Sequence, residues 1–590
     1  MRGEKNSTPI EIYKELKDFV TEEARSSRNS HENLLRKPVR DRILVGKCLN
    51  RIKFVRKLAE GILRFECAAN ESEFREGDFV TLHTGNPFEP LGQAQWVGDG
   101  ISSSGREYID LAVSESCAKQ IDASGGELTL DARYFDLSPQ LLKALDEMGA
   151  SDRGRSRILP LFCDETESGG VDPEEYDVAT ENAEEEGFNN PQTDAIGIGS
   201  SCSWCSLIQG PPGTGKTRVL AQIVRERVSR GERILITACT HRAINEALLK
   251  VVSLDPENKR TAKIGLAGRD ALGAVPYYEN LSETDFELST EGYVIGATPY
   301  CAFSDRLKQA NFDCVIIDEA SQMTLPLAIM AMLSADCYVV IGDQKQLPPV
   351  VQCRRPMEAQ DYGLFQRLGS VSEREMLSTT YRMNRSICEW VSTEFYLSEL
   401  DTSESSSDKV LGLSGKPSQP WLEEVLRPDK SLVWIPTTVE TTRQYSMEEA
   451  DLVNQIMGEL HRRGHKLSDV GVVTPFRRQA RVIRNRLQKN SSFDPAELQG
   501  LVVDTVERMQ GQERDVIILS TAAADSGFLE AVQEFIYAPA RLNVIVSRAR
   551  VKVIVLAANG FLEVEGSSDA MCDAIEHWKG LKEASHVVKV

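Results

Sequence analysis

The stretch SLIQGPPGTGKTRVLAQIV, residues 206–224, constrains the fold of this chain more than any other segment. It matches the pattern G-x-x-x-x-G-K-[ST], with an apolar strand expected before the glycines and a helix after them. In this pattern backbone N–H groups face phosphate oxygens, Lys216 reaches the β and γ oxygens, and the Thr217 hydroxyl binds Mg²⁺. The segment therefore predicts a nucleotide-binding P-loop. The residues expected around the phosphates are Gly210, Pro211, Pro212, Gly213, Thr214, Gly215, Lys216 and Thr217.

Two further apolar strands end in polar side chains that suit such a site. FDCVIIDEAS ends its apolar run at Asp318 and Glu319, and carboxylates at the end of a buried strand can hold Mg²⁺ and polarise the attacking water. YVVIGDQKQLPP places Gln346 where it can sense the γ-phosphate. Two acids at a strand exit without a chemical role are the alternative for the first strand. The residues predicted to carry hydrolysis here are Lys216, Asp318, Glu319 and Gln346, with Thr217 and Asp318 on the metal.

Composition narrows the class of protein. The chain has 590 residues, of which 41% are apolar and 27% charged, as in a soluble globular protein of about three or four domains. No apolar run approaches the ~20 residues that span a bilayer, and the first residues lack the apolar core of a secretory signal. We therefore expect a cytoplasmic location, or a nuclear one in a eukaryote. The net charge of −21 argues against a generally basic coat for nucleic acid.

The 13 cysteines have no regular spacing, which predicts reduced thiols rather than a disulfide framework. Cys202 and Cys205 form a CxxC pair, but no second pair follows at a zinc-ribbon interval. Small residues entering a buried strand are therefore the better interpretation of this pair.

Changes in residue composition and in expected secondary structure divide the chain. Residues 10–60 are predicted to be helical, and residues 61–135 consist of short β-branched or aromatic segments separated by Gly, Asn and Asp, typical of a small antiparallel barrel. Between Asp164 and Glu186 there are 11 acidic residues and no Lys or Arg, which predicts a solvated linker. Beyond it, apolar strands alternate with amphipathic helices, the pattern of parallel α/β layers.

A series of motifs in a fixed order resembles the superfamily 1B helicases. FNNPQTDAI is similar to that family's adenine-reading motif, with Gln192 in the Gln position, and DEAS and GDQKQLPP match its second and third motifs. TYRMNRSI resembles the fourth, VVDTVERMQGQERDVIILS the fifth and RLNVIVSRAR the sixth. The resemblance covers roughly residues 188–560, and it is to the branch that contains the nonsense-mediated-decay helicase, senataxin and the immunoglobulin-mu-binding helicase.

The resemblance implies an α/β fold with two tandem RecA-like P-loop NTPase domains, preceded by a helical stalk and a small β-barrel. The implied domains are residues 1–150 for the stalk and barrel, 151–187 for an acidic linker, 188–370 for the first RecA-like domain and 371–590 for the second.

The same resemblance implies that ATP lies on the first RecA-like domain and that arginines from the second reach its γ-phosphate. By matching positions, Arg382 and Arg548 are these trans-acting cations. Tyr381 is implied to stack near the adenine, and Glu513 to contact the ribose. A surface salt bridge beside a strand is the alternative for Arg548.

Nucleic-acid contacts are encoded less clearly. The small polar and aromatic residues that match strand-tracking motifs are Thr240, His241, Thr298, Thr474, Pro475 and Phe476. The arginines that follow, from Arg477 to Arg486, recur mostly at helical spacing, so a solvated helix face is at least as good an interpretation as a phosphate track. The sequence departs from the family pattern at His241, Gln344, Thr380, Asn384 and Arg385.

The function that follows is an ATP-driven helicase or translocase that acts on single-stranded RNA or DNA. The resemblance implies 5′-to-3′ movement, ATP and Mg²⁺ as cofactors, and a motor that we expect to be monomeric. One alternative is a nucleic-acid-stimulated ATPase that remodels protein–nucleic-acid complexes without processive unwinding. Another is a non-motor protein that binds ATP as a conformational switch, which the trans-acting arginines disfavour.

Overall fold

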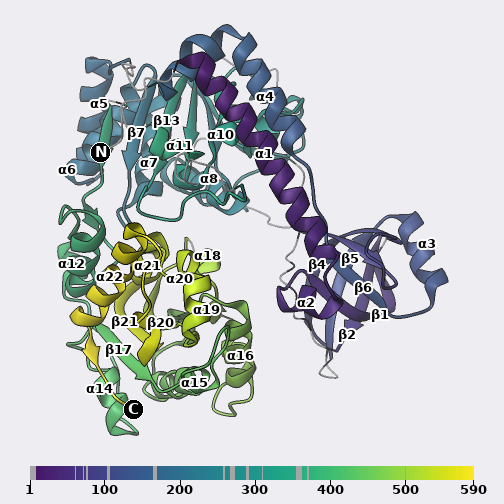
Figure 1. Cartoon of the computed structure of the whole chain (residues 1–590). Coiled ribbons are helices and arrows are strands. Elements are labelled where there is room, and N and C mark those ends of the chain that lie inside the picture. Colours follow the sequence, from purple (N-terminus) through teal and green to yellow (C-terminus); the bar gives the residue numbers. More distant parts are fainter. Residues whose placement is uncertain are drawn as a thin grey trace. The chain divides into compact units, whose positions relative to one another are not determined.

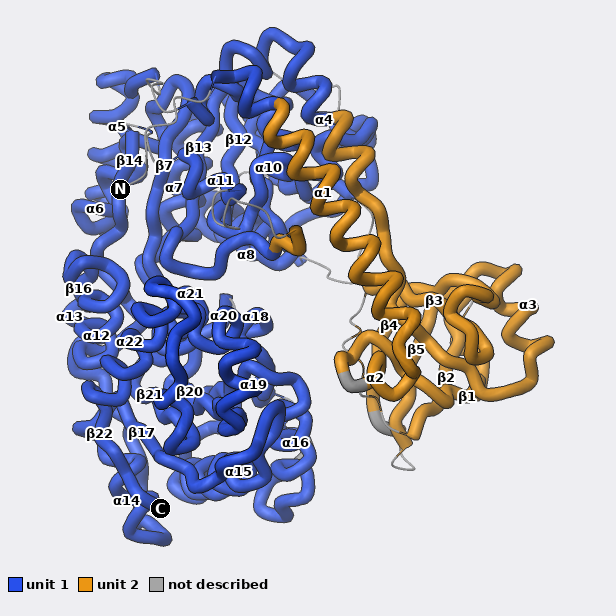
Figure 2. The backbone as a smooth tube through the Cα atoms, in the orientation of Figure 1, with its two compact units in different colours: residues 1–13, 144–350, 356–590 blue, residues 14–143, 351–355 orange. Residues whose placement is uncertain are grey.

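The computed structural model separates the chain into two compact units (Figure 2). The smaller comprises Lys14–Lys143 and Val351–Arg355, and the larger comprises Met1–Tyr13, Ala144–Val350 and Pro356–Val590. The residues that the structure describes are 8–59, 61–68, 70, 72, 74, 77–102, 106–163, 169–256, 260–265, 273–286, 291–307, 310–353, 362–368, 371, 373–498, 500–509 and 511–590. Among them, no helix has the length and apolar character needed to cross a lipid bilayer.

The smaller unit contains a closed barrel of six strands in the order β1-β2-β5-β4-β3-β6. Its strands are β1 (Cys48–Ala59), β2 (Ile62–Cys67), β3 (Phe79–His83), β4 (Gly92–Ile101), β5 (Glu107–Val113) and β6 (Leu128–Ala132). Buried and partly exposed residues alternate along β2, as the two-residue period of a strand requires, and Phe65, Trp96 and Ile109 fill the interior. The helices α1 (Pro9–Leu35), α2 (Val39–Leu44) and α4 (Ser138–Ala150) flank it in the chain, so the expected stalk and barrel are confirmed.

The barrel begins earlier in the chain than the sequence predicted. We expected helices through residue 60, but β1 starts at Cys48 and pairs with both β2 and β6. Arg51 has a φ of 56°, and the pairing with β6 shifts register between Leu49 and Ile52. Pairing with strands that lie far away in the chain overrides the local helical spacing of this basic segment.

The first α/β domain of the larger unit is built on an eight-stranded sheet in the order β10-β9-β11-β8-β12-β13-β7-β14 (Figure 1). All of its strand pairs are parallel. The strands are β7 (Cys205–Gln209), β8 (Arg233–Thr237), β9 (Thr261–Ile264), β10 (Tyr277–Tyr278), β11 (Tyr293–Gly296), β12 (Cys314–Ile317), β13 (Cys337–Gly342) and β14 (Arg374–Met376). Because β14 pairs with β7, the sheet extends past the boundary expected at residue 370.

Helices connect these parallel strands. They include α6 (Asn190–Ser201), α7 (Lys216–Ser229), α8 (His241–Leu254), α9 (Pro299–Ala302) and α10 (Leu325–Met332). The strands β11, β12 and β13 are buried along their whole length, which is why they appear in the sequence as unbroken apolar runs rather than alternating ones. Every ligand-facing loop predicted from the first half of the motif series follows the carboxyl end of one of these strands.

Cys202 and Cys205 are both buried, and Cys205 begins β7, as the sequence predicted. The Cys202 sulfur lies 3.7 Å from that of Cys337. Within the described part of the chain, no group of three or more His, Cys, Asp and Glu side chains has the geometry to hold a metal ion by itself.

The second α/β domain has a six-stranded sheet in the order β19-β18-β20-β21-β17-β22, again with parallel pairs. Its strands are β17 (Leu432–Thr437), β18 (Val470–Val473), β19 (Val502–Asp504), β20 (Arg514–Ser520), β21 (Ala549–Ala558) and β22 (His586–Val587). The helices include α12 (Arg385–Phe395), α15 (Met447–Arg462), α16 (Arg477–Gln488), α19 (Ser526–Ala531), α21 (Pro539–Val546) and α22 (Asp569–Ala584). Two tandem parallel α/β domains are therefore present, as expected.

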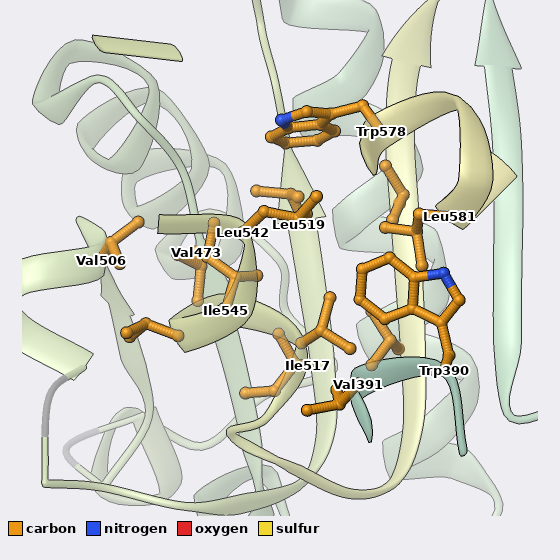
Figure 3. Packing of buried hydrophobic residues seen from close by; sticks show 14 of the residues in the cluster. Trp390, Val391, Val473, Val506, Ile517, Leu519, Leu542, Ile545, Trp578 and Leu581 are labelled. Carbon is orange, nitrogen blue, oxygen red and sulfur yellow. The ribbon is translucent and has the colours of Figure 1, made fainter. Parts of the chain in front are cut away.

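Each central strand of this second sheet serves two hydrophobic cores. Ile517 and Leu519 of β20 belong to one cluster, whereas Val516 and Ile518 belong to another, because successive side chains of a strand point to opposite faces. Figure 3 shows Ile517 and Leu519 in the first cluster, together with Trp578 of α22. Helices therefore cover both faces of the sheet, shield it from solvent and fix the loops at its two ends.

Residues 173–185 of the expected acidic linker form a packed helix. Asp172 caps α5 (Pro173–Glu185) by accepting hydrogen bonds from the N–H groups of Glu174 and Glu175, each at 3.0 Å. Ala179 and Ala183 are buried on the face that packs against α6. Residues 164–168 lie outside the described part of the chain. The expectation of a solvated linker does not hold for residues 173–185, because small apolar residues recur there at helical spacing among the acids.

Trp578 offers a test of the second domain's core. Its side chain is 1% exposed and packs against Phe561 and Tyr537, so we expect Trp578→Ala to lower the free energy of unfolding by about 3–5 kcal/mol through the cavity it leaves. Urea unfolding followed by circular dichroism measures this. The adjacent Lys579→Ala is the control, since a surface change should stay within about 0.5 kcal/mol. Equal losses in the two variants would contradict the assignment.

Candidate nucleotide site

The P-loop joins the end of β7 to the start of α7 and touches the second α/β domain. Gly213 and Gly215 have φ angles of 76° and 85°, in the left-handed region that favours glycine. A Cβ atom on Gly213 would lie 2.5 Å from the Cβ of Arg382 and 2.6 Å from the hydroxyl of Thr380. Glycine is therefore required there both for the turn and for the close approach of the second domain.

Lys216 is the first residue of α7 and points back over the loop. Its ammonium donates hydrogen bonds to the carbonyl oxygens of Gly210 and Pro211. Hydrogen bonds to charged acceptors are roughly twice as strong as those to neutral ones, so a phosphate would take the ammonium from these carbonyls. Thr217 occupies the next position, at the amino end of the helix, where its hydroxyl can reach a metal ion beside the phosphates.

Two buried acids follow the neighbouring strands β12 and β13. The pKa of Asp318 is raised to about 7, chiefly by burial and then by the Glu319 carboxylate, while the Lys216 ammonium acts in the opposite direction. Burial also raises the pKa of Asp343. A divalent cation would stabilise the ionised form of Asp318, so the donor set of Thr217 and Asp318 fits Mg²⁺.

Glu319 and Gln346, the other predicted hydrolytic residues, have distinct surroundings. Glu319 has a φ of 52°, which is rare for a residue other than glycine, and its carboxylate accepts a hydrogen bond from Gln322 at 3.1 Å. Gln346 is buried and donates to the Asp343 carboxylate at 2.7 Å. In this structure the Gln346 amide is therefore engaged by Asp343, and its contact with a γ-phosphate stays a prediction.

A hydrogen-bond relay that the sequence did not reveal links this strand end to the second domain. The Tyr396 hydroxyl donates to Asp343 at 2.6 Å, and Asn543 donates to the carbonyl of Lys345 at 2.8 Å and to the Tyr396 oxygen at 2.9 Å. Tyr396 follows α12 and Asn543 lies on α21. The relay therefore runs from the third motif of the first domain to two helices of the second.

Arg382 is held by an acid of its own domain. Its Nε donates to the Glu513 carboxylate at 2.7 Å and its Nη1 to the carbonyl of Ser547 at 3.1 Å. Arg550 donates to the other oxygen of Glu513 at 2.8 Å. Although burial alone would raise it, these two guanidiniums lower the pKa of Glu513 to about 2. Glu513 is thus the counter-ion of Arg382 in this structure, and its implied contact with the ribose stays a prediction.

Arg548 is buried, at 4% exposure, and is only partly satisfied. Its Nη1 donates to the carbonyl of Gln512 at 3.3 Å, and its Nε makes no hydrogen bond with any described residue. The pKa of Arg548 is lowered to about 9, chiefly by burial and then by the charge of Arg382, while the carboxylate of Glu319 acts in the opposite direction. A buried guanidinium in this state is stabilised by an incoming anion, which argues against a surface salt bridge.

The residues predicted for the adenine side come together. Gln192 completes the cap of α6 with Asn189 and donates to the carbonyl of Thr214 in the P-loop at 2.9 Å. Asn189 donates to the Tyr381 hydroxyl at 2.8 Å, and the Tyr381 N–H donates to the carbonyl of Gly213. Tyr381 keeps 41% of its surface exposed, so its ring is available for stacking.

The candidate nucleic-acid residues of the first domain lie at the ends of β8 and β11, which are neighbours in the sheet. Thr240 caps α8 by accepting from the N–H of Ala243, and Thr298 caps α9 by accepting from the N–H of Cys301. His241 is exposed at the first position of α8. Both threonines thus sit where helix amino ends favour phosphate.

The corresponding residues of the second domain are less accessible. Thr474 is fully buried, and its hydroxyl accepts from the N–H of Phe476 at 3.3 Å. Pro475 is half-buried, and Phe476 packs against Phe528 and Phe535. Thr474 therefore shapes the turn after β18, and the structure does not bring its hydroxyl to the surface.

Comparison with known proteins bears on both domains. Residues 192–352 match a family model described as an AAA domain, and residues 360–560 match a second model with the same description. The chain is 29% identical over 388 residues to the DNA replication ATP-dependent helicase/nuclease JHS1 of Arabidopsis thaliana, which covers 63% of this chain and 28% of that protein. It is 26% identical over 527 residues to the DNA replication ATP-dependent helicase/nuclease DNA2 of Mus musculus, covering 78% and 47%.

The two matched domains and these relatives support two tandem RecA-like helicase domains of the superfamily 1 kind. The chain spans less than half the length of these two relatives. The narrower resemblance to the branch of the nonsense-mediated-decay helicase is not confirmed. Among solved structures, the crystal structure of Arterivirus nonstructural protein 10 (helicase) gives a TM-score of 0.37 at 13% identity, covering 91% of this chain and 82% of that one.

The hydrogen bonds from Tyr396 and Asn543 to the first domain predict that Tyr396 couples ATP hydrolysis to the second domain. We expect Tyr396→Phe to lower kcat for ATP hydrolysis about tenfold with little change in the affinity for ATP, because the lost hydroxyl leaves Asp343 short of a cross-domain hydrogen bond. Steady-state hydrolysis together with equilibrium binding of a fluorescent ATP analogue measures both quantities. Tyr537→Phe is the matched control, since its buried hydroxyl bonds within the second domain, to the carbonyl of Phe561. A similar fall in both variants would contradict a coupling role.

The pairing of Glu513 with Arg382 predicts that the Glu513 carboxylate weakens the binding of phosphates. We expect Glu513→Gln to tighten the binding of inorganic tripolyphosphate about 2- to 5-fold, because Arg382 loses a competing carboxylate whose side chain is 40% exposed. Isothermal titration calorimetry with tripolyphosphate and with ATP distinguishes the two roles. Weaker ATP binding with unchanged tripolyphosphate binding would instead support contact with the ribose.

Proposed function

We propose that this chain is an ATP-dependent helicase that moves along single-stranded nucleic acid by closing and opening its two RecA-like domains. The observation that carries the proposal is the buried, partly satisfied guanidinium of Arg548, whose pKa is influenced by Glu319 of the opposite domain. A γ-phosphate between Lys216 and Arg548 would satisfy cations from both domains at once.

The cycle follows from the partners that each cation has without nucleotide. ATP takes Lys216 from the Gly210 carbonyl and draws Arg382 away from Glu513, so its binding favours the closed state. Loss of the γ-phosphate returns both cations to their own domains and removes the closing force. Alternating closure and opening moves a strand that is bound to both domains.

The remaining roles belong to the same proposal. Thr217 and Asp318 would hold Mg²⁺, which would neutralise charge on the phosphates, and Glu319 would orient the attacking water. Gln192 and Tyr381 line the adenine. We assign residues 188–370, extended by β14, to the ATP-binding domain and the residues that follow to the second domain.

The substrate is proposed from the relatives. Both are named as DNA replication helicases, which favours single-stranded DNA over RNA for this chain. Backbone-directed contacts at Thr240 and Thr298 suit a motor that moves on any sequence. We further propose 5′-to-3′ movement by a monomer, as in the 1B branch whose motifs the chain resembles.

Hydrolysis tests the nucleotide site. We expect single-stranded DNA to stimulate ATP hydrolysis, and Arg548→Ala to lower kcat by about 10³-fold or more, as for other arginine fingers. Lys216→Ala should abolish hydrolysis. Arg486→Ala is the control, because Arg486 pairs with Asp451 on the surface of the second domain. Hydrolysis that no single strand stimulates would favour an ATP-binding switch.

Strand displacement tests the motor. We expect the chain to unwind a duplex with a 5′ single-stranded tail and to leave one with a 3′ tail intact. Matched DNA and RNA tails measure the preference between the two nucleic acids. Movement on 3′ tails alone would overturn the polarity, and stimulated hydrolysis without displacement on either tail would point to a remodelling ATPase.

A further inference from the structure

A second surface of interest in the second domain lies at the carboxyl ends of its strands. The loop after β17 leads to Tyr445, the turn after β18 leads into α16 and Arg478, and the segment after β20 reaches Asp525. We call the side chains of Arg443, Tyr445 and Arg478 the Tyr445 platform. Parallel strands end at the same edge of a sheet, so these loops form one surface.

The platform consists of a tyrosine ring covered by a guanidinium. The Arg478 guanidinium carbon lies 4.2 Å from the centroid of the Tyr445 ring, within the range of a cation–π contact. Arg478 is exposed, and the ring keeps 38% of its surface in solvent. Arg443 lies beside them in the chain, 67% exposed and 3.6 Å from Asp525. A flat aromatic surface and two cations are therefore presented together.

Gln479 holds this surface rigid. It is fully buried, its oxygen accepts from the N–H of Ser446 at 2.9 Å, and its amide donates to the Ser446 carbonyl at 3.1 Å and to the Ser520 hydroxyl at 2.9 Å. The backbone next to Tyr445 is thus tied on both sides. The Thr442 carbonyl accepts from the N–H of Asp525 at 2.9 Å, which anchors the other end of the loop.

Arg478 differs from Arg486 of the same helix, α16, in its partner. Arg486 pairs with the carboxylate of Asp451 at 2.5 Å, which neutralises it. Arg478 instead stacks on an aromatic ring and keeps its charge available. Four residues before it, Thr474 shapes the turn after β18, so the platform adjoins the segment that resembles a strand-tracking motif.

We propose that the Tyr445 platform binds one base of a single strand by stacking, with Arg443 and Arg478 contacting the flanking phosphates. The inference rests on the proposed function, because it extends the path of the strand over the second domain. Every base has a π-face, so stacking on tyrosine tolerates any sequence, as a motor requires. An exposed ring with two flanking cations is a better binding site for a flat, negatively charged ligand than for the apolar surface of another protein.

The test separates stacking from charge. We expect Tyr445→Ala to weaken the binding of a fluorescein-labelled 20-mer of dT about 5- to 150-fold, the range for loss of one stacked base, with no effect on an abasic 20-mer of the same charge. Tyr445→Phe keeps the ring and should bind like the original chain. Arg478→Ala should weaken both oligonucleotides. Fluorescence anisotropy measures the binding of each variant. Phe88→Ala is the control, because Phe88 is an exposed aromatic residue in the smaller unit.

Each outcome decides. Equal weakening of both oligonucleotides by Tyr445→Ala, or no weakening of either, overturns the platform while leaving the helicase proposal intact. Absence of dT binding by the unmodified chain overturns both. Unaltered ATP hydrolysis without nucleic acid in every variant shows that the nucleotide site is unaffected. A folding role for Tyr445 would instead shift the thermal unfolding midpoint of Tyr445→Ala alone. If that variant also binds both oligonucleotides equally weakly while Tyr445→Phe binds normally, stacking is overturned.

Discussion

The guanidinium of Arg548 is the group on which the nucleotide site depends. Burying a charge without full hydrogen bonding costs several kcal/mol, and the described residues leave the Nε of this guanidinium without an acceptor. A fold can retain this cost when binding of an anionic ligand to the buried guanidinium offsets it. On the proposed function, one γ-phosphate would stabilise Lys216, Arg382 and Arg548 together, although these cations come from two domains.

The two domains are already in contact at this site. Thr380 donates to the carbonyl of Pro212, Tyr381 donates to that of Gly213, and Tyr396 donates to Asp343. These bonds end on the P-loop or on the strand end that carries the third motif. On the proposed function, these hydrogen bonds would carry a change at the phosphates to the second domain.

The two ends of the second sheet carry different tasks. Glu513 and Arg548 precede β20 and β21, whereas Thr474 and the Tyr445 platform follow β18 and β17. Since these strands are parallel, the trans-acting arginines lie at the opposite edge of the sheet from the proposed base contact. In the first sheet both tasks share the carboxyl edge, with phosphate residues after β7 and β12 and the capping threonines after β8 and β11. A rigid second sheet can thus transmit movement from one edge to the other.

The sequence by itself predicted the P-loop, the alternating strands and helices of the α/β domains, the short strands of the barrel and the strand ends at Asp318 and Thr240, because each is a pattern of residues that are close in the chain. Only the tertiary structure decided that Glu513 neutralises Arg382, that Gln346 faces Asp343 and that Gln479 supports Tyr445 from a buried position. It also decided that residues 48–59 form a strand, through pairing with β6 some 80 residues away. Hydrophobic periodicity and turn chemistry act locally, whereas the partner of a polar side chain is chosen by packing that brings distant segments together.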